Sequence, residues 1–574
     1  MCFLTTIFYT FERKTEMKKI YFLLLFVIEV SVFAQIKKGE FYLTPDSDAH
    51  ELYVAFNTSV DFNGQMTSSN AINNIPQLET IFTQYGVQLE KGVLLSDEKI
   101  NQMANDALRI SKSDINVRKL KNVAKVKIDN PTNQRLFELA GLLEGIKEID
   151  FCSLLSLKPI DPPFLLPPSD IPPVTPDYES FQNYIGADPG VNMTYAWGLG
   201  LNGSGIRIRD CEYGFNINHE DLAGKNVSVS PGMTISSSAS TSYTEHGTAT
   251  FGVLYADRGG YGVSGMVYGA QELMLFPEWQ QIGYDRANAV TKAIQSSVAG
   301  DVIIYEMQTV GNGGSTYVPA EYNSLIWTLT KAATDSGIII VAAAGNGNQN
   351  LDDAYYAPYM SRGNSGAIIV GAGTPNTAHN KMSFSTYGTR VDVQAWGGSV
   401  RTTGYGDYSQ IGGDFNQNYT NFSGTSSATP IVTACVVALQ SYYYSQTSSY
   451  MTPSQMRQLL IDTGIAQGTG GHIGPIPNMQ AAIELINATL SIKENNQIVF
   501  SVYPNPSRDK VTVNLFQDFS AKKVEIYSVL GQKISVKDFE GQSIDLDIST
   551  LEKGIYFLKI KSGSKETTKK FIKE

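Results

Sequence analysis

Residues 421–430 read Asn-Phe-Ser-Gly-Thr-Ser-Ser-Ala-Thr-Pro, and an apolar run follows from Ile431 to Leu439. Small flexible residues and a proline ahead of an apolar run predict a loop that turns into a helix, because proline suits the first helical turn. The run is apolar on nearly every side, so we expect this helix to be buried. Ser426 would lie at its N-terminus, where unpaired N–H groups and the helix dipole favour a developing negative charge. Ser426 is therefore a candidate nucleophile.

A serine nucleophile needs a base, and the base needs a group that orients it. Of the five histidines, His246 is the one followed by Gly-Thr, at a polar-to-apolar switch where a helix should begin. Upstream, the segment 205–210 alternates like a strand and ends on Asp210. Open α/β sheets place their chemistry at the carboxyl ends of strands. We predict that Asp210 orients His246 and that His246 activates Ser426. The remaining histidines lack this context, and we interpret them as structural or exposed: His50, His219, His379 and His472.

The chain order Asp210, His246, Ser426 is the order found in subtilisin. The sequences of three segments also resemble the serine, histidine and oxyanion-hole signatures of the subtilisin-like serine peptidases of family S8: Gly424–Pro430, His246–Thr248 and Ala343–Asn346. The resemblance covers roughly residues 185–490. It implies a secreted serine endopeptidase with Asn346 as an oxyanion-hole donor. It also implies a doubly wound, mostly parallel sheet with helices on both faces.

The strand and helix pattern of this region agrees with that fold. Two short continuous apolar runs, 301–305 and 337–342, are typical of parallel strands that are buried on both faces. Residues 320–333 between them read as a helix, so we expect a right-handed crossover in a doubly wound sheet. Arg207 and Arg209 depart from this pattern, and we expect them to pair with nearby acidic side chains.

The N-terminal region predicts export. Basic residues at 17–19 precede an apolar stretch, 20–28, and Ala34 offers a small residue for cleavage. We assign residues 1–34 to a signal peptide with an upstream extension, since the apolar stretch is too short for a membrane anchor.

Residues 35–157 end in a helix followed by a short strand, which resembles the end of subtilisin-type propeptides; a permanent accessory domain is the alternative. The proline-rich linker at 158–184 would be extended and open to processing.

The C-terminal region changes character after residue 490. A linker at 491–499 leads into residues 500–574, where short alternating segments between turns predict a small antiparallel β-sandwich. Its opening Tyr-Pro-Asn-Pro at 503–506 resembles the C-terminal sorting domain of type 9 secretion cargo. The resemblance implies the type 9 outer-membrane machinery as a partner, and a location outside or on the surface of a Gram-negative bacterium. A substrate-binding β-module is the alternative.

Composition restricts the partners further. The formal charge of −11 argues against a nucleic-acid partner, which would require a basic face. After the N-terminus no stretch reaches the ~20 apolar residues of a membrane span. We expect a monomer that acts on proteins or peptides. Cys211 and Cys435 could form a disulfide, but we interpret both as free core cysteines.

Specificity and metal binding depend on departures from the family pattern. Glu306-Met307-Gln308 stands where relatives have a small Ser-Leu-Gly segment lining the substrate cleft, so Glu306 could favour a basic substrate side chain.

No cofactor is required. Relatives often bind calcium, and Asp221 matches one ligand position, with the oxygen chemistry that calcium prefers. The loop 257–260 lacks the usual asparagine ligand, so structural calcium stays open.

Three function classes remain. An active secreted serine endopeptidase is favoured. A related acid peptidase, with glutamate in place of histidine, is disfavoured by the motif at 246–248. A catalytically inactive surface binding protein with the subtilisin fold is the remaining alternative, and the presence of all four candidate residues argues against it.

Overall fold

Seven parallel strands form the sheet of the central part of the chain, in the order β16-β15-β14-β11-β6-β8-β7. The strands are β6 (Arg207–Glu212), β7 (Val227–Val229), β8 (Glu272–Pro277), β11 (Val302–Tyr305), β14 (Ile339–Ala343), β15 (Ile368–Gly373) and β16 (Val393–Trp396). The strands β7 and β8, which follow β6 in the chain, lie on one side of β6. The later strands, beginning with β11, lie on its other side. This reversal between β6 and β11 is the topological switch point, where open α/β sheets bind ligands. The predicted doubly wound parallel sheet is confirmed.

The computed structural model describes residues 38–57, 60, 62, 75–161, 170–171, 175–239, 241–313, 316–411, 415–495, 500–515, 522–541, 543–563 and 565–574. The predicted signal peptide lies outside these residues. Parts of the two predicted linkers, 162–169, 172–174 and 496–499, also lie outside them.

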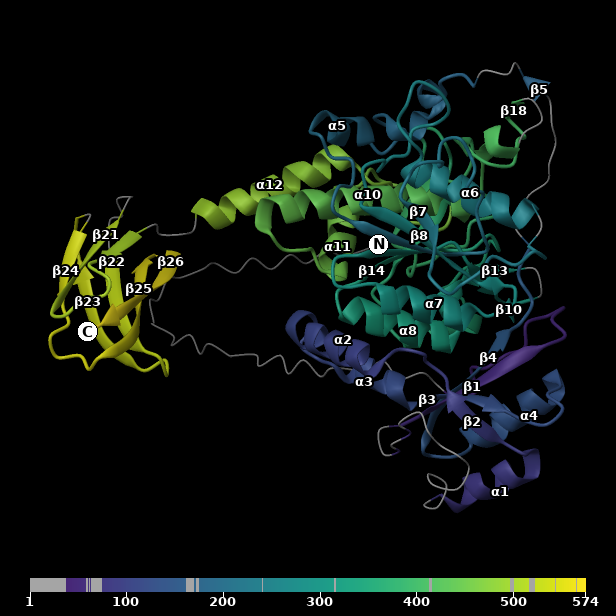
Figure 1. Ribbon diagram of the computed structural model, residues 1–574, viewed down its shortest axis with the longest axis horizontal. Helices are drawn as coiled ribbons and strands as arrows, with labels where there is room; N and C mark the ends of the chain where they lie inside the picture. Colours follow the sequence, from purple (N-terminus) through teal and green to yellow (C-terminus); the bar gives the residue numbers. More distant parts are fainter. Residues whose placement is uncertain are drawn as a thin grey trace, which may run out of the picture. The chain divides into compact units, whose positions relative to one another are not determined.

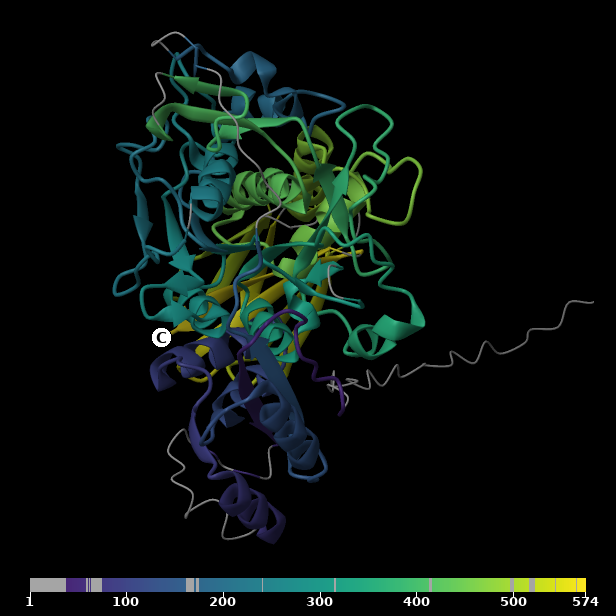
Figure 2. The same cartoon turned by 90° about the vertical axis from the view of Figure 1, so that its right-hand side faces the viewer.

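Helices cover both faces of the central sheet (Figure 1). α6 (Thr241–Tyr255) and α10 (Thr425–Thr447) lie on one face, while α7 (Arg286–Ser296) and α8 (Ser324–Asp335) lie on the other. Helix α10, drawn in green, runs through the middle of the central part in both views (Figures 1 and 2). Its residues from Thr425 to Gln440 are all buried, as the apolar run predicts. The helix starts earlier than predicted, so Pro430 lies in its second turn, where the missing N–H removes a hydrogen bond.

Shorter elements complete the central part. The helices are α5 (Met193–Gly198), α9 (Ala357–Ser361), α11 (Pro453–Thr463) and α12 (Met479–Asn495). The strands are β5 (Asp170–Ile171), β9 (Trp279–Gln280), β10 (Gly283–Tyr284), β12 (Gln308–Val310), β13 (Tyr317–Pro319), β17 (Val400–Thr403), β18 (Ser409–Ile411) and β19 (Asn418–Phe422). None of the helices within the described residues is long and apolar enough to cross a membrane.

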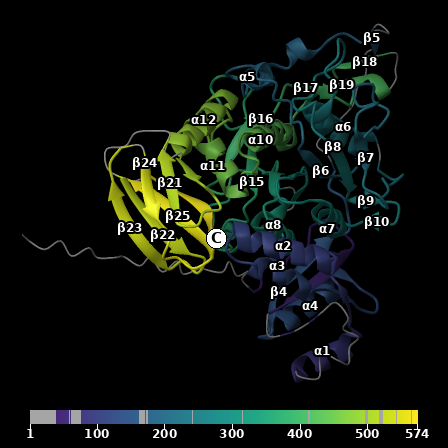
Figure 3. The same cartoon turned by 60° about the vertical axis from the view of Figure 1, so that its left-hand side comes forward.

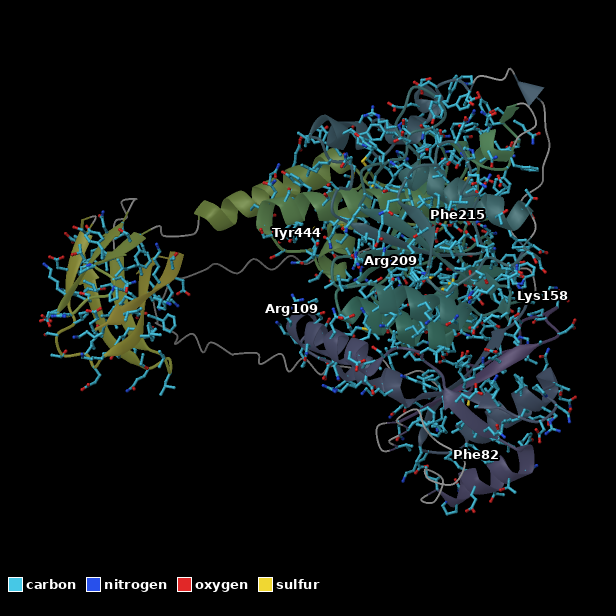
Figure 4. All side chains as sticks on the ribbon, viewed as in Figure 1. Phe82, Arg109, Lys158, Arg209, Phe215 and Tyr444 are labelled. Carbon is cyan, nitrogen blue, oxygen red and sulfur yellow. The ribbon has the colours of Figure 1, made fainter. Side chains whose placement is uncertain are left out.

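The two arginines of β6 pair with acids, as expected. Arg207 forms a salt bridge with Asp301, and Arg209 forms one with Glu272 at 2.7 Å. The side chain of Arg209, labelled in Figure 4, is only 1% exposed. A buried guanidinium without such a partner would cost several kcal/mol. These pairs explain how a central strand tolerates two charged residues.

The N-terminal part is an α+β unit. Its antiparallel sheet has the order β2-β3-β1-β4, with β1 (His50–Phe56), β2 (Gln88–Lys91), β3 (Val123–Lys127) and β4 (Ile149–Ser156). Its helices are α1 (Pro76–Tyr85), α2 (Asp97–Ile110), α3 (Ile115–Lys119) and α4 (Asn133–Glu144). Phe82, labelled in Figure 4, belongs to its apolar core. The predicted helix followed by a short strand corresponds to α4 and β4.

The C-terminal part consists of two antiparallel sheets around one apolar core (Figure 3). One sheet contains β20 (Phe500–Tyr503), β21 (Lys510–Leu515) and β24 (Ser543–Asp547). The other contains β22 (Lys522–Ser528), β23 (Lys533–Phe539), β25 (Gly554–Ser562) and β26 (Lys565–Lys573). Two stacked antiparallel sheets form the predicted β-sandwich.

Three cysteines lie among the described residues, and all three are buried and free: Cys152, Cys211 and Cys435. The predicted absence of a disulfide between Cys211 and Cys435 therefore agrees with the structure.

Candidate active site

Ser426 lies in the first turn of α10, at the carboxyl edge of the central sheet. The residue before the helix, Gly424, has φ of 100°, a conformation that side chains rarely adopt. This glycine turns the chain from β19 into the helix, and Ser426 follows two residues later. Ser426 is 4% exposed. Its backbone N–H belongs to the unpaired group at the helix N-terminus, where negative charge is stabilised.

His246 lies within α6, five residues after the helix begins, so the helix starts earlier than the sequence predicts. The glycine after it has a steric role. A Cβ atom on Gly247 would lie 2.1 Å from the carbonyl oxygen of Gly214 and 2.8 Å from Glu212 Cγ. The absence of a side chain at position 247 therefore lets α6 approach the end of β6. This approach places His246 beside Glu212.

Glu212 is the acid that contacts His246. His246 Nδ1 forms a hydrogen bond with Glu212 Oε2, and the backbone N–H of Tyr213 donates to Glu212 Oε1 at 2.7 Å. Glu212 is 1% exposed and His246 is 4% exposed. Both carboxylate oxygens are thus occupied and the imidazole is held in one orientation. This is the arrangement in which a buried carboxylate fixes the tautomer of a histidine base.

Asp210 does not occupy the position that the sequence predicts for it. Its side chain is fully buried, and neither carboxylate oxygen has a hydrogen-bond partner. Burial raises the pKa of the Asp210 carboxyl well above its usual range, and Glu212 and Glu278 raise it further. The alternation of the sequence stops at Asp210, but the pairing of β6 with β8 continues to Glu212. The carboxyl end of the strand is therefore two residues later, and the assignment of Asp210 as the orienting acid is corrected to Glu212.

Asn346 lies three residues after β14, next to the start of α10. Its Oδ1 accepts hydrogen bonds from the backbone N–H and the hydroxyl of Thr425, at 2.8 and 3.0 Å. The oxygen is thereby fixed and the amide Nδ2 remains to donate. The position that a Cβ atom would take on Gly424 lies 3.2 Å from Asn346 Nδ2 and 3.6 Å from the Ser426 nitrogen. Two N–H donors therefore border one small space, as an oxyanion hole requires.

Glu306 is not a solvent-facing cleft residue. It follows β11 directly, is 5% exposed and lies close to Ser426. Its burial removes the basis for the predicted pairing with a basic substrate side chain, since such pairing needs an accessible carboxylate.

Asp221 does not form a metal site with the described side chains. Its Oδ2 accepts the N–H of Val263 at 2.9 Å, and its Oδ1 has no hydrogen-bond partner. Within the described ranges no group of three His, Cys, Asp or Glu side chains could hold a metal ion. Calcium takes six to eight oxygen ligands, which include backbone and amide oxygens, so Asp221 by itself would supply only one or two of them. We therefore derive no step of the reaction through calcium.

Glu245, beside the candidate base, makes stability depend on pH. It is 2% exposed and accepts the N–H of Tyr405 at 2.7 Å. Burial raises the pKa of Glu245 from 4.5 to about 7. The folded protein therefore holds this proton more tightly than the unfolded chain, and the stability it contributes is lost as the pH rises from 4.5 to about 7. A difference of this size corresponds to about 3 kcal/mol at most.

We expect Glu245→Gln to remove this pH dependence. Urea unfolding of inactive protein, followed at several pH values, measures it. The wild-type free energy of unfolding should fall more steeply between pH 4.5 and 7 than that of the variant. Equal slopes in the two proteins would contradict the prediction.

Comparison with known proteins identifies the family. Residues 203–488 match the subtilase family. This domain belongs to the subtilase family of serine-type endopeptidases. Residues 501–574 match the secretion system C-terminal sorting domain, so the chain joins a subtilase domain to an export domain. The predicted resemblance of both regions is confirmed.

Individual relatives agree with this assignment. The chain is 27% identical over 292 residues to a subtilisin of Bacillus pumilus, covering 50% of this chain and 93% of that protein. It is 28% identical over 279 residues to the minor extracellular protease Epr of Bacillus subtilis, covering 48% of this chain but 38% of that protease. Among solved structures, fervidolysin of Fervidobacterium pennivorans, a keratinolytic enzyme related to subtilisin, is similar with a TM-score of 0.50 and 16% identity. That match covers 94% of this chain and 78% of fervidolysin, and supports the subtilisin fold alone.

Proposed function

We propose that this subtilase is an exported serine endopeptidase in which Ser426 is the nucleophile and His246 the general base. Glu212 orients the base. The observation that carries the proposal is the buried contact between Glu212 and His246 at the switch point of the sheet, where the helix that bears Ser426 also begins. A catalytically inactive binding protein would not need a histidine held by a buried carboxylate. No observation favours that alternative.

The reaction follows from these positions. His246 accepts the proton of Ser426 as the hydroxyl oxygen attacks the peptide carbonyl, and it later gives this proton to the leaving amine. The Glu212 carboxylate stabilises the imidazolium that forms between the two steps. The N–H of Ser426 and the amide of Asn346 donate to the oxyanion of the tetrahedral intermediate. Water then hydrolyses the acyl-enzyme by the same route.

Hydrolysis of casein tests this proposal against the acid-peptidase alternative. We expect cleavage at about pH 8, where an ordinary imidazole is neutral, and none at about pH 3.5, where it is protonated. A fluorophosphonate should abolish the cleavage, because it reacts with an activated serine. Cleavage at the acidic pH alone would refute the assignment of His246 as base.

Asn346→Leu should slow the acylation step because it removes one oxyanion donor while keeping a similar side-chain volume. We expect kcat to fall about 10²–10³-fold with little change in KM. Steady-state kinetics on a chromogenic peptide measures both constants. A rise in KM with unchanged kcat would instead assign Asn346 to substrate binding.

We further propose that residues 35–157 are a propeptide. The backbone N–H and C=O of Ile160, just after this region, both form hydrogen bonds with the hydroxyl of Tyr213, at 3.1 and 2.7 Å. Tyr213 directly follows Glu212, so this segment lies next to the candidate site. Asp161 also accepts the hydroxyl of Tyr243, three residues before His246. A segment held there would obstruct substrate until it is cleaved.

The C-terminal domain suggests the route of export. We propose that residues 501–574 are read by a type 9 outer-membrane machinery of a Gram-negative cell and then removed. The intact mass of the protein recovered outside the cells tests both flanking proposals, because it shows which ends have been lost. Protein that stays in the cells after deletion of 501–574 would support the sorting role.

A further inference from the structure

Glu306 lies at the same edge of the sheet as Glu212. In the parallel pairing of β11 with β6, Ile304 is opposite Asp210 and Tyr305 is opposite Cys211. Continued by one residue, this register brings position 306 alongside position 212. The side chains of a strand alternate between its faces, so Asp210 and Glu212 share one face of β6. Glu306 therefore stands beside the carboxylate that holds His246.

The surroundings of Glu306 contain acids and a hydroxyl. Glu306 is 5% exposed, and neither of its carboxyl oxygens has a hydrogen-bond partner within ordinary bonding distance. The groups that act on it are Asp210 and Glu212 from β6 and Ser426 from α10. No cationic side chain is among them. His246, on α6, reaches this cluster through its hydrogen bond with Glu212.

These surroundings favour the protonated form of Glu306. Two neighbouring buried carboxyl groups do not both ionise at neutral pH, because each disfavours the charge of the other. Glu212 accepts a hydrogen bond from the N–H of Tyr213 and contacts His246. The hydroxyl of Ser426 acts on Glu306, but no cationic side chain does. Burial raises the pKa of Glu306 well above its usual range, Asp210 and Glu212 raise it further, and Ser426 lowers it. Glu306 therefore holds its proton more strongly than an exposed glutamate does.

We propose that Glu306 is a further residue of the active site, whose uncharged carboxylic acid beside Ser426 permits the reaction and whose ionised form suppresses it. The proposal rests on the function proposed above, since it takes Ser426 as the nucleophile. In the reaction the proton of Ser426 still passes to His246 and then to the leaving amine, and Glu306 retains its own proton throughout. A buried anion at this position would repel the oxyanion of the tetrahedral intermediate. Activity would therefore require Glu306 to be neutral.

The test is the pH dependence of kcat/KM for a chromogenic peptide, in wild type and in Glu306→Gln. Glutamine keeps the size of the side chain and cannot ionise. We expect the wild-type activity to fall on the alkaline side of its optimum, and we expect this loss of activity to be at least about tenfold smaller in the variant. Superimposable profiles would overturn the proposal. A wild-type profile that stays flat over the whole alkaline range in which the protein remains folded would also overturn it, even if the variant does not fold.

Two further measurements separate the explanations. Glu245→Gln is the matched control, because Glu245 is also a buried glutamate near His246 but belongs to another element and accepts the N–H of Tyr405. We expect this variant to keep the alkaline fall in activity. Absence of the fall in Glu245→Gln would assign it to Glu245 and refute the role of Glu306.

The ratio of cleavage after basic and apolar residues should be equal in wild type and Glu306→Gln, whereas a changed ratio would assign Glu306 to specificity. Fluorophosphonate labelling of Ser426 that persists while the profiles coincide would reject the Glu306 proposal and leave the peptidase function intact.

Discussion

Ser426→Ala is expected to abolish peptide hydrolysis and labelling by a fluorophosphonate. The first turn of α10 holds Ser426 with its N–H among the unpaired donors of the helix, next to the amide of Asn346. Alanine leaves this backbone in place and removes the oxygen that would form the acyl-enzyme. In triads of this type, loss of the nucleophile costs about 10⁶-fold in kcat, while the oxyanion hole retains a small residual rate. Labelling followed by intact mass measures the loss directly.

The adjacent Ser427 provides the control. Its hydroxyl is fully buried and donates to the carbonyl oxygens of Trp396 and Gly424, at 2.9 and 3.0 Å. Ser427→Ala should lower stability by about 1–3 kcal/mol because buried acceptors lose their donor. It should still react with the probe. Labelling that survives in Ser426→Ala and disappears in Ser427→Ala would move the nucleophile by one position.

Glu212→Gln is expected to produce the second largest loss. Glutamine preserves the size of the side chain but removes the charge and presents an amide to His246 Nδ1, which favours the wrong tautomer. The corresponding change in a serine peptidase triad lowers kcat about 10⁴-fold without altering the geometry. The same measurement on Asp210→Asn should show less than about a tenfold change, because Asp210 makes no hydrogen bond to the triad.

The comparison of the two acids decides the composition of the triad. Glu212→Asp adds a graded test, since it shortens the side chain by one carbon and withdraws the carboxylate from His246. A displacement of about 1 Å can cost about 10²-fold in rate. A large loss in Asp210→Asn together with an active Glu212→Gln would restore Asp210 as the orienting acid. Circular dichroism of each variant checks that the fold is retained.

Much of the fold could be predicted because hydrophobic patterns are local. The apolar runs at 301–305 and 337–342 correspond to β11 and β14, and the segment before β14 forms α8. The turn-rich pattern after residue 500 predicts a β-sandwich, and the structure has two sheets around one apolar core in this region. Element boundaries were less accurate. α6 and α10 both begin several residues before their apolar stretch.

The candidate site was predicted in part. The motifs around Ser426, His246 and Asn346 led to residues that lie at one edge of the sheet. Asp210 was selected because the alternation of β6 ends there in the sequence. Strand pairing with β8 continues two residues further, and Glu212 lies at the true end.

The sequence by itself determined the class of the fold and indicated the candidate nucleophile, the candidate base and the candidate oxyanion-hole donor, because each depends on a short motif and its local conformation. The tertiary structure alone decided which acid holds His246 and which acid lies beside Ser426. Both depend on the register between β6, β8 and β11 and on the helix that passes over them. Burial beside other acids then favours the neutral form of Glu306.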